Sequence, residues 1–377
     1  MIQPFLRFEF QKILNYFKTK TLAKAITPTL FLAVFVFIGL GIYGFFISGF
    51  RFINFEAVED IRLALTLYLY EVFLIVLSGV IVFSALVSGI FNLFKSDTNN
   101  WILSSPGYRV FPKIVLIKSI LTSSLPSLIM FIPAVLAFHR VNHLGVTGII
   151  LILVSVLLLL LLLNSLTLLF IVGAGSVYYQ VSKKLKTLAF TFKGLVVFLV
   201  LLVATVVALI WKAMRSVDLV RVFKADVDTE VLSLSNISSH FHFLPTHPFA
   251  MEILHLQNNE LSAALLNFCA LFLFASISGY LWWRFSYIFY PLWQKFQEGS
   301  SKQDRDVDSP FGVARSSYHF DGSIMTVLFK KEILVFSRNL KGMLWFLFLS
   351  VIWLMQIGAN VILGHNIARH IPDLSER

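Results

Sequence analysis

The chain has 377 residues, of which 58% are hydrophobic and only 14% are charged, and it contains 39 Phe. Soluble domains carry about 25% charged residues. This composition therefore excludes a water-soluble enzyme, a disordered protein and a disulfide-rich secreted domain, and it is typical of a polytopic membrane protein. The single cysteine, Cys269, lies in an apolar run and can form no intrachain disulfide.

Long stretches without charged side chains predict where the chain crosses a bilayer. A spanning helix needs about 20 apolar residues. A membrane barrel would instead show short segments of alternating polarity, which this sequence lacks. We therefore predict an all-α polytopic membrane protein. Its seven spans are expected near 25–50, 65–94, 113–139, 145–175, 194–213, 261–288 and 342–364.

The distribution of basic residues predicts the orientation of these spans. Short cytoplasmic loops collect Lys and Arg. When alternate connecting segments are assigned to two sides, the side that holds the N-terminus carries 22 of the 31 Lys and Arg residues. We therefore expect a cytoplasmic N-terminus. The net charge of +11 then follows largely from topology, and no nucleic-acid partner is expected.

Two segments that precede spans resemble each other. FLRFEFQKILNYFK (5–18) aligns with LFKKEILVFSRNLK (328–341) at an offset of 323, which places Glu9 opposite Glu332. Apolar residues fall at i, i+4, i+7 and i+11 in both copies, which predicts helices 4–20 and 324–341 lying in the membrane interface. The other reading is that any juxtamembrane helix shows this pattern.

The repeat predicts the domain organisation. We expect a first transmembrane unit over 1–290, a cytoplasmic linker over 291–323 and the start of a second unit over 324–377. The second unit would hold only its entrance helix and one span. The chain is therefore expected to be incomplete at its C-terminus, or to carry a degenerate second half.

Four features carry a resemblance to a known family. They are the entrance helix with Arg7, Glu9 and Lys12, the loop DTNNWILSSPGYRVFPKIVLIKS (97–119), the pair Pro126 and Pro133 in the third span, and the segment FKKEILVFSRNLKGML (329–344). With them the chain resembles the membrane (permease) subunit of bacterial ABC exporters of the ABC-2 type. One departure is Asn15, where the second copy has Arg338.

The resemblance implies a fold and a function. The fold would be a six-span ABC-2 type unit with an interfacial entrance helix, followed by the start of a second similar unit, in the bacterial cytoplasmic (inner) membrane. The chain would be a permease subunit of an ATP-driven exporter and no enzyme, with ATP on a separate ABC ATPase subunit and no cofactor of its own. The lipid bilayer is the other expected partner, and a homodimer or pseudo-dimer is left open.

Two further observations bear on this function. The sequence contains no G-x-x-x-x-G-K-[ST] phosphate loop, which agrees with a nucleotide held elsewhere. The alternatives are a secondary transporter driven by an ion gradient, an intramembrane enzyme and a scaffold. The enzyme is disfavoured because GAGS (173–176) is no nucleophile elbow and no H-E-x-x-H is present.

Polar residues on the cytoplasmic side are the candidates for contact with the ATPase, the alternative being plain membrane anchoring. The candidates come from both entrance helices and from a loop with turn chemistry. They are Arg7, Glu9, Lys12, Ser104, Ser105, Pro106, Gly107, Lys330 and Glu332.

Within the spans, Glu71 is the one acidic residue, and it is a candidate for a gate or a substrate pathway. The alternative is a carboxyl that reaches outward or shares a hydrogen bond with Tyr68, Tyr70 or a neighbouring helix. Asn164, Ser165 and Thr167 are expected to form interhelical hydrogen bonds.

The four histidines of the 212–260 loop do not suggest a metal site, because the spacing of His240 and His242 suits a strand and no cysteine lies nearby. The stretch 243–252 is expected to form an ordered cap before the sixth span.

Overall fold

The computed structural model describes residues 39–48, 59–94, 111–184, 194–202 and 244–294, with positions 11, 33, 36, 37, 50 and 205 in addition. The chain divides into two units, Met1–Gly299 and Ser300–Arg377. All described residues belong to the first unit, and their regular structure is helical.

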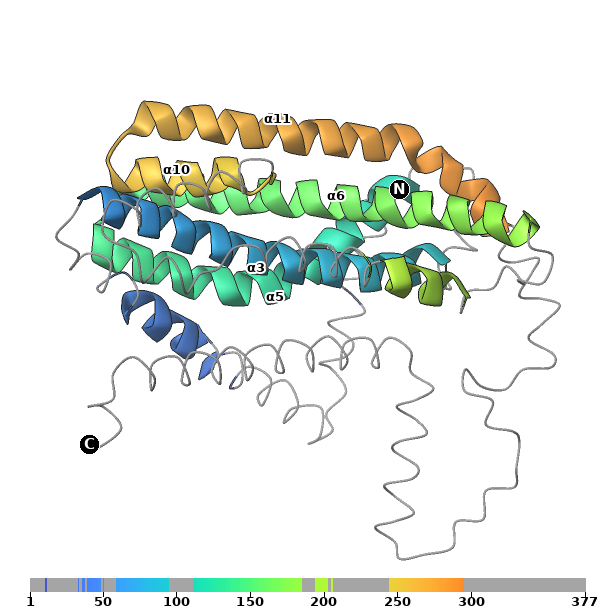
Figure 1. Cartoon of the computed structure of the whole chain (residues 1–377), viewed down its shortest axis with the longest axis horizontal. Helices are drawn as coiled ribbons and strands as arrows, with labels where there is room; N and C mark the ends of the chain where they lie inside the picture. Colours follow the sequence, from blue (N-terminus) through green and yellow to red (C-terminus); the bar gives the residue numbers. More distant parts are fainter. Residues whose placement is uncertain are drawn as a thin grey trace, which may run out of the picture. The chain divides into compact units, whose positions relative to one another are not determined.

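Four long helices and one short helix, together with the helical residues 39–48 and 194–202, make up the described part of the chain (Figure 1). The helices are α3 (Glu59–Phe94), α5 (Phe111–Asn142), α6 (Val146–Lys184), α10 (His247–Gln257) and α11 (Leu261–Phe285), which the 3-10 turn η2 (Ser286–Ile288) follows. The sequence-based prediction of a helical protein is thus confirmed for the described residues.

Within the described ranges, three helices are long and apolar enough to cross a membrane: Tyr70–Phe94, Val146–Lys184 and Leu261–Gln294. A fourth span results if Phe111–Ser124 and Pro126–Asn142 are counted together. At 1.5 Å per residue, the 39 residues of α6 extend over about 58 Å, which exceeds the roughly 30 Å of a hydrocarbon core.

The six-span unit is not confirmed. Of the expected span 25–50, the helix 39–48 is described, and of 194–213, the helical residues 194–202. The expected span 342–364 lies outside the described residues.

Helix α5 bends by 51° between Phe111–Ser124 and Pro126–Asn142. Proline has no backbone N–H, and its ring collides with the carbonyl one turn earlier, so a kink at Pro126 is the expected result. The indole Nε1 of the buried Trp282 in α11 donates to the carbonyl oxygen of Pro112 at 3.0 Å, which joins the start of α5 to α11.

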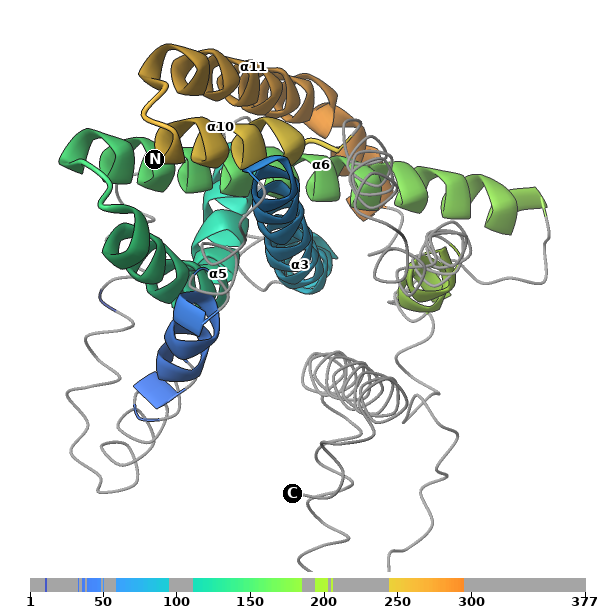
Figure 2. The same cartoon turned by 60° about the vertical axis from the view of Figure 1, so that its left-hand side comes forward.

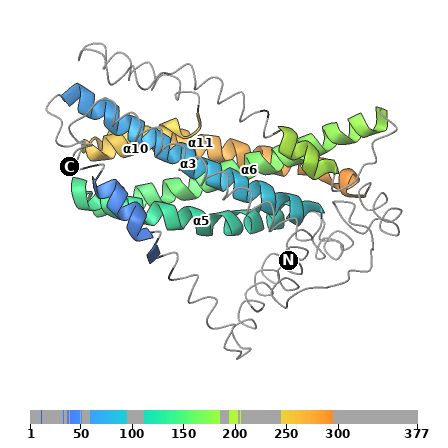
Figure 3. The ribbon, with the colours of Figure 1, turned by 60° about the horizontal axis from the view of Figure 1, so that its bottom comes forward.

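Helices α3 and α6 approach each other closely at a glycine. A Cβ atom added at Gly89 would lie 2.7 Å from Cδ1 of Ile171 and 3.0 Å from Cδ2 of Leu168. The missing side chain of Gly89 thus makes room for the ends of two α6 side chains, as small residues do between packed helices. The long helices α3, α5 and α6 pack against one another; they lie together along the bundle in Figures 1 and 3, and α6 crosses α3 and α5 in the view of Figure 2.

Candidate functional site: buried polar side chains around helix α10

Helix α10 begins with a local signal. Pro248 occupies the first turn, where its missing N–H is no loss, and the carbonyl of Thr246 accepts from the N–H groups of Phe249 and Ala250. Its apolar residues recur at a helical spacing and are buried: Phe249, Ala250, Ile253 and Leu256. The helix packs on α11, α3 and α6 (Figures 1 and 2).

Adjacent residues of α3 hold the two ends of α10. The Nδ1 atom of His247, at the first residue of α10, lies 2.7 Å from Oε1 of Glu71. The hydroxyl of Tyr70 donates to Oε1 of Gln257, at the last residue of α10, over 2.9 Å. Tyr70 and Glu71 are 3% and 1% exposed. The contact of Glu71 is therefore a hydrogen bond to a neighbouring helix.

The imidazole of His247 is neutral at neutral pH in this environment. Burial lowers the pKa of His247 below its usual value of 6.5, because desolvation disfavours the charged ring. The contact with Glu71 is therefore a hydrogen bond between the carboxyl group and a neutral ring.

Glu252 lies on the buried face of the same helix. It is 0% exposed, and its Oε1 and Oε2 atoms lie 2.8 and 2.7 Å from the hydroxyl Oγ of Ser155 in α6. Burial raises the pKa of Glu252 from 4.5 to about 8, and the hydrogen bond from Ser155 opposes this rise only in part. The carboxyl group therefore keeps its proton at neutral pH.

A second polar cluster joins α3, α5 and α6. The Oδ1 atom of Asn164 accepts from the hydroxyl of Ser119 at 2.7 Å, and Nδ2 donates to the hydroxyl of Ser123 at 2.9 Å. Both serines belong to α5, so the predicted interhelical role of Asn164 is confirmed. The hydroxyl of Thr167 donates instead to its own helix, at the carbonyl of Leu163, and the buried Ser165 hydroxyl has no hydrogen-bond partner among the described residues.

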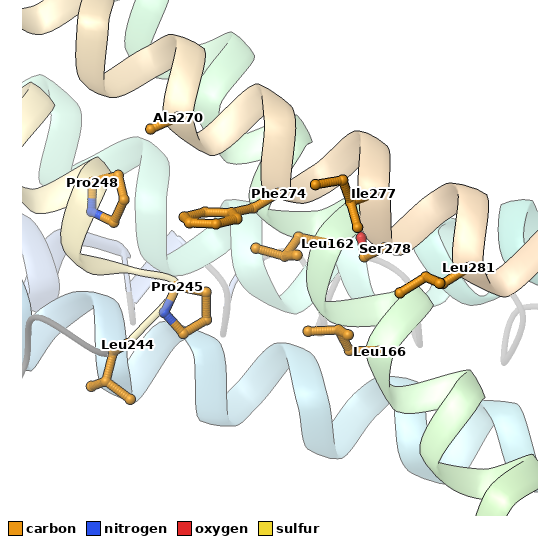
Figure 4. A pocket seen from close by; sticks show the side chains of 10 residues that line it. All are labelled: Leu162, Leu166, Leu244, Pro245, Pro248, Ala270, Phe274, Ile277, Ser278 and Leu281. Atoms are coloured by element: carbon orange, nitrogen blue, oxygen red, sulfur yellow. The ribbon is translucent and has the colours of Figure 1, made fainter.

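An apolar pocket of about 520 Å³ lies between α6, α11 and the residues that lead into α10 (Figure 4). The hydroxyl of Ser278 faces it but already donates to the carbonyl of Ala275 at 2.9 Å. The remaining lining is apolar: Leu162, Leu166, Leu244, Pro245, Pro248, Ala270, Phe274, Ile277 and Leu281. The pocket therefore offers contacts to hydrocarbon and no hydrogen-bond donor that is still available.

Glu71 is the one predicted site residue that falls within the described part of the chain. The other candidates, Arg7, Glu9, Lys12, Ser104, Ser105, Pro106, Gly107, Lys330 and Glu332, lie outside the described residues. Among the residues that the structure describes, no group of three or more His, Cys, Asp and Glu side chains could hold a metal ion.

The sequence interpretation did not identify Glu252 as a buried acid. It placed residues 212–260 in an outer loop, with an ordered cap over 243–252, whereas the structure has the packed helix α10 at His247–Gln257. A usable signal was present: Phe249, Ile253 and Leu256 follow the i, i+4, i+7 spacing of a buried helix face, and Glu252 lies within that spacing.

Comparison with known families gives a match over most of the chain. A family model described as "Putative ATP-binding cassette" matches residues 19–363. No curated protein and no solved structure matches the chain.

This match corrects the functional predictions. The identification as an ABC-2 type permease is wrong, and so are the permease function, the ion-driven alternative and the expectation of a chain with no nucleotide-binding role and no cofactor, because the matched family is one of ATP-binding cassettes. The resemblance rested on features that any membrane protein can show. Apolar runs, basic entrance helices and proline-containing loops follow from the bilayer, so they recur in unrelated membrane chains.

The family description implies nucleotide binding but does not identify the residues that would contact the nucleotide. The sequence contains no G-x-x-x-x-G-K-[ST] run, so nucleotide contacts would have to come from other residues. The match extends over more than nine-tenths of the sequence, and the chain belongs to this ATP-binding cassette family.

Proposed function

We propose that this chain is a membrane-embedded, nucleotide-linked component of an ATP-binding cassette transport system. The observation that carries the proposal is the extent of the family match. Residues 19–363 include the three described helices that are long and apolar enough to span a bilayer. The family relationship and the apolar helices therefore belong to the same stretch of chain.

The surface of α11 supports the membrane part of this proposal. Large apolar side chains are exposed along it, among them Leu266, Phe272 and Ile277, at 71%, 52% and 54%. A soluble protein rarely exposes so continuous an apolar surface. A bilayer would cover this surface, and its apolar side chains would then have no unfavourable contact with water.

The predicted organisation becomes part of the proposal. We take the membrane to be the bacterial cytoplasmic membrane, with the N-terminus inside, and the units to be 1–290, 291–323 and 324–377. The polar positions at Arg7–Lys12, Ser104–Gly107 and Lys330–Glu332 are then the surfaces proposed to meet another chain of the same system.

Labelling at the turn between α10 and α11 tests the nucleotide link. Asn258 is exposed at this turn. Asn258→Cys in a Cys269→Ser background gives one reporter thiol. Host membranes are permeabilised so that a maleimide and Mg-ATP reach both sides. We expect the labelling rate to change with Mg-ATP and to stay constant with Mg-AMP. Equal rates with Mg-ATP and Mg-AMP would overturn the proposed nucleotide link.

A second experiment asks whether the nucleotide binds to this chain. The family description predicts that a photoreactive ATP analogue labels the purified chain in lipid nanodiscs, and that excess ATP abolishes the labelling while AMP does not. A purified, folded chain that takes up no label would contradict nucleotide binding by this chain itself.

A further inference from the structure

The contact between Glu252 and Ser155 has two carboxyl oxygens but only one hydroxyl donor. Both carboxyl oxygens lie within 2.8 Å of one hydroxyl oxygen, and a serine hydroxyl has a single proton to donate. An ionised carboxylate would have to share this one proton between its two oxygens in a bifurcated hydrogen bond. A neutral carboxyl group satisfies both contacts, because it donates its own proton to Oγ and accepts the hydroxyl proton at its other oxygen.

Among the residues that the structure describes, no basic side chain forms an ion pair with Glu252. Helix α6 carries no ionisable side chain between Val146 and Val177. The ionisable groups of the other packed elements have contacts of their own or lie elsewhere along their helices. Among the side chains that the structure describes, they are Tyr70 and Glu71 on α3, Lys113, Lys118, His139 and Arg140 on α5, His247 and His255 on α10, and Cys269, Tyr280 and Arg284 on α11.

Most of these groups bond to residues other than Glu252. Among the described residues, the hydrogen-bond partner of Glu252 is Ser155. Tyr70 bonds to Gln257, and Glu71 to His247. His139 bonds to the carbonyl of Leu144, Arg140 donates to Tyr43, and His255 pairs with Glu260. An unpaired carboxylate at a fully buried position would be costly.

We propose that Glu252 is a proton-binding site that controls whether α10 stays packed against α6. While the carboxyl group holds its proton, the neutral acid remains buried on Ser155. When the proton leaves to solvent, the carboxylate must reach water, and the buried face of α10 separates from α6. The contacts of Tyr70 and Glu71 at the two ends of α10 keep the helix attached to α3.

Accessibility of the buried face of α10 as a function of pH tests this proposal. Ala250 is 0% exposed on that face, whereas Asn258 is exposed. Each position is replaced by cysteine in a separate full-length Cys269→Ser chain in nanodiscs. The maleimide labelling rate at 250 is divided by that at 258, which removes the pH dependence of the thiol reaction itself. We expect this ratio to rise about tenfold between pH 6.5 and 9.5 with a midpoint near pH 8, as the neutral acid is lost.

Two variants make the result specific to Glu252. Glu252→Gln keeps a neutral side chain of the same shape, so the ratio should stay low at every pH. Glu260→Gln, at an exposed acid of the adjoining turn, should leave the rise unchanged. A constant ratio in the parent chain, or an equal rise in Glu252→Gln, overturns the proposal.

Ser155→Ala gives an independent readout should Glu252→Gln fail to fold. In the packed state the serine hydroxyl bonds to the neutral acid, whereas the separated carboxylate is hydrated, so removal of the hydroxyl should move the midpoint to lower pH. A midpoint that stays in place or moves to higher pH overturns the proposal, because the rise would then report another group.

Discussion

The Nδ1 atom of His247 lies 2.7 Å from Oε1 of Glu71, although 176 positions separate the two residues in the chain. The contact joins the first residue of the short helix α10 to the long helix α3. Because burial keeps His247 neutral, the contact is a hydrogen bond rather than an ion pair at neutral pH. Its contribution to stability should therefore be insensitive to salt.

This contact predicts a measurable coupling between its two residues. Glu71→Leu leaves the polar ring of His247 without this acceptor, so we expect a loss of about 1–3 kcal/mol in the free energy of unfolding. Glu71→Gln retains a hydrogen-bonding group and should cost less. A double-mutant cycle of Glu71→Leu and His247→Leu, measured by unfolding in an uncharged detergent, should give a coupling energy of about 0.5–3 kcal/mol.

The pair His255 and Glu260 serves as the matched control for that cycle. It has the same 2.7 Å distance, but Glu260 is 55% exposed. Water and salt weaken exposed pairs to about 0–1 kcal/mol. A coupling for Glu71 and His247 no larger than that of this exposed pair would contradict the role given to the buried contact.

Replacing a glycine of α3 by alanine should have different effects on stability at Gly89 and at Gly79. Gly89→Ala places a methyl group 2.7 Å from Cδ1 of Ile171, so the side chains of Ile171 and Leu168 must shift, which should cost about 1–3 kcal/mol of unfolding free energy. At Gly79 no atom lies within 4 Å of the added Cβ, so Gly79→Ala should be neutral or stabilise the chain by up to about 1 kcal/mol. Thermal unfolding of both variants compares them directly, and equal midpoints would refute the close packing at Gly89.

The cluster around Asn164 predicts a difference between two polar residues of α6. Asn164→Leu removes bonds to Ser119 and Ser123 and leaves the Ser119 hydroxyl without this acceptor, which should cost about 1–2 kcal/mol. Thr167→Val removes one bond within its own helix and should cost less. Unfolding in detergent measures both losses. A larger loss for Thr167→Val would show that the cluster contributes little to helix association.

The buried Glu252 predicts how stability depends on pH. Its pKa of about 8 in the folded chain exceeds the usual value of 4.5, so the folded chain binds more protons than the unfolded chain between these values. Stability should therefore fall as the pH rises from 4.5 to about 8, by up to about 1.4 kcal/mol per pH unit, and level off above that.

Unfolding at several pH values measures this dependence, and Glu252→Gln provides the control. The difference in unfolding free energy between parent and variant cancels the other titrating groups. It should fall across this range and be constant above pH 8.5 or so. A difference that rises with pH would mean that the carboxylate, and not the acid, is the form that the fold stabilises.

Hydropathy predicted the long helices because their cause is local. A run such as Val156–Leu163 has to lie away from water whatever its neighbours are, and α6 includes it. The kink of α5 was also readable, since Pro126 lacks the N–H that a straight helix needs.

The site could be predicted only in part, because its contacts depend on tertiary packing. The sequence identifies Glu71 as an acid within an apolar stretch, but it cannot show that His247 is the partner. Burial of Glu252 does not follow from hydropathy, because α10 has only 11 residues and one buried face and so forms no long apolar run. The family was missed because bilayer-imposed patterns do not separate one membrane family from another.

The position of α11 in the bilayer is the claim on which the proposed function depends, and the natural Cys269 tests it. Cys269 is the single cysteine of the chain, is exposed on the folded protein, and lies about 12 Å along α11 from Leu261. We predict that a membrane-impermeant maleimide does not label it in permeabilised native membranes and labels it fully after denaturation in detergent. Labelling in intact membranes at the rate of the exposed reporter Asn258→Cys would contradict the membrane-embedded account.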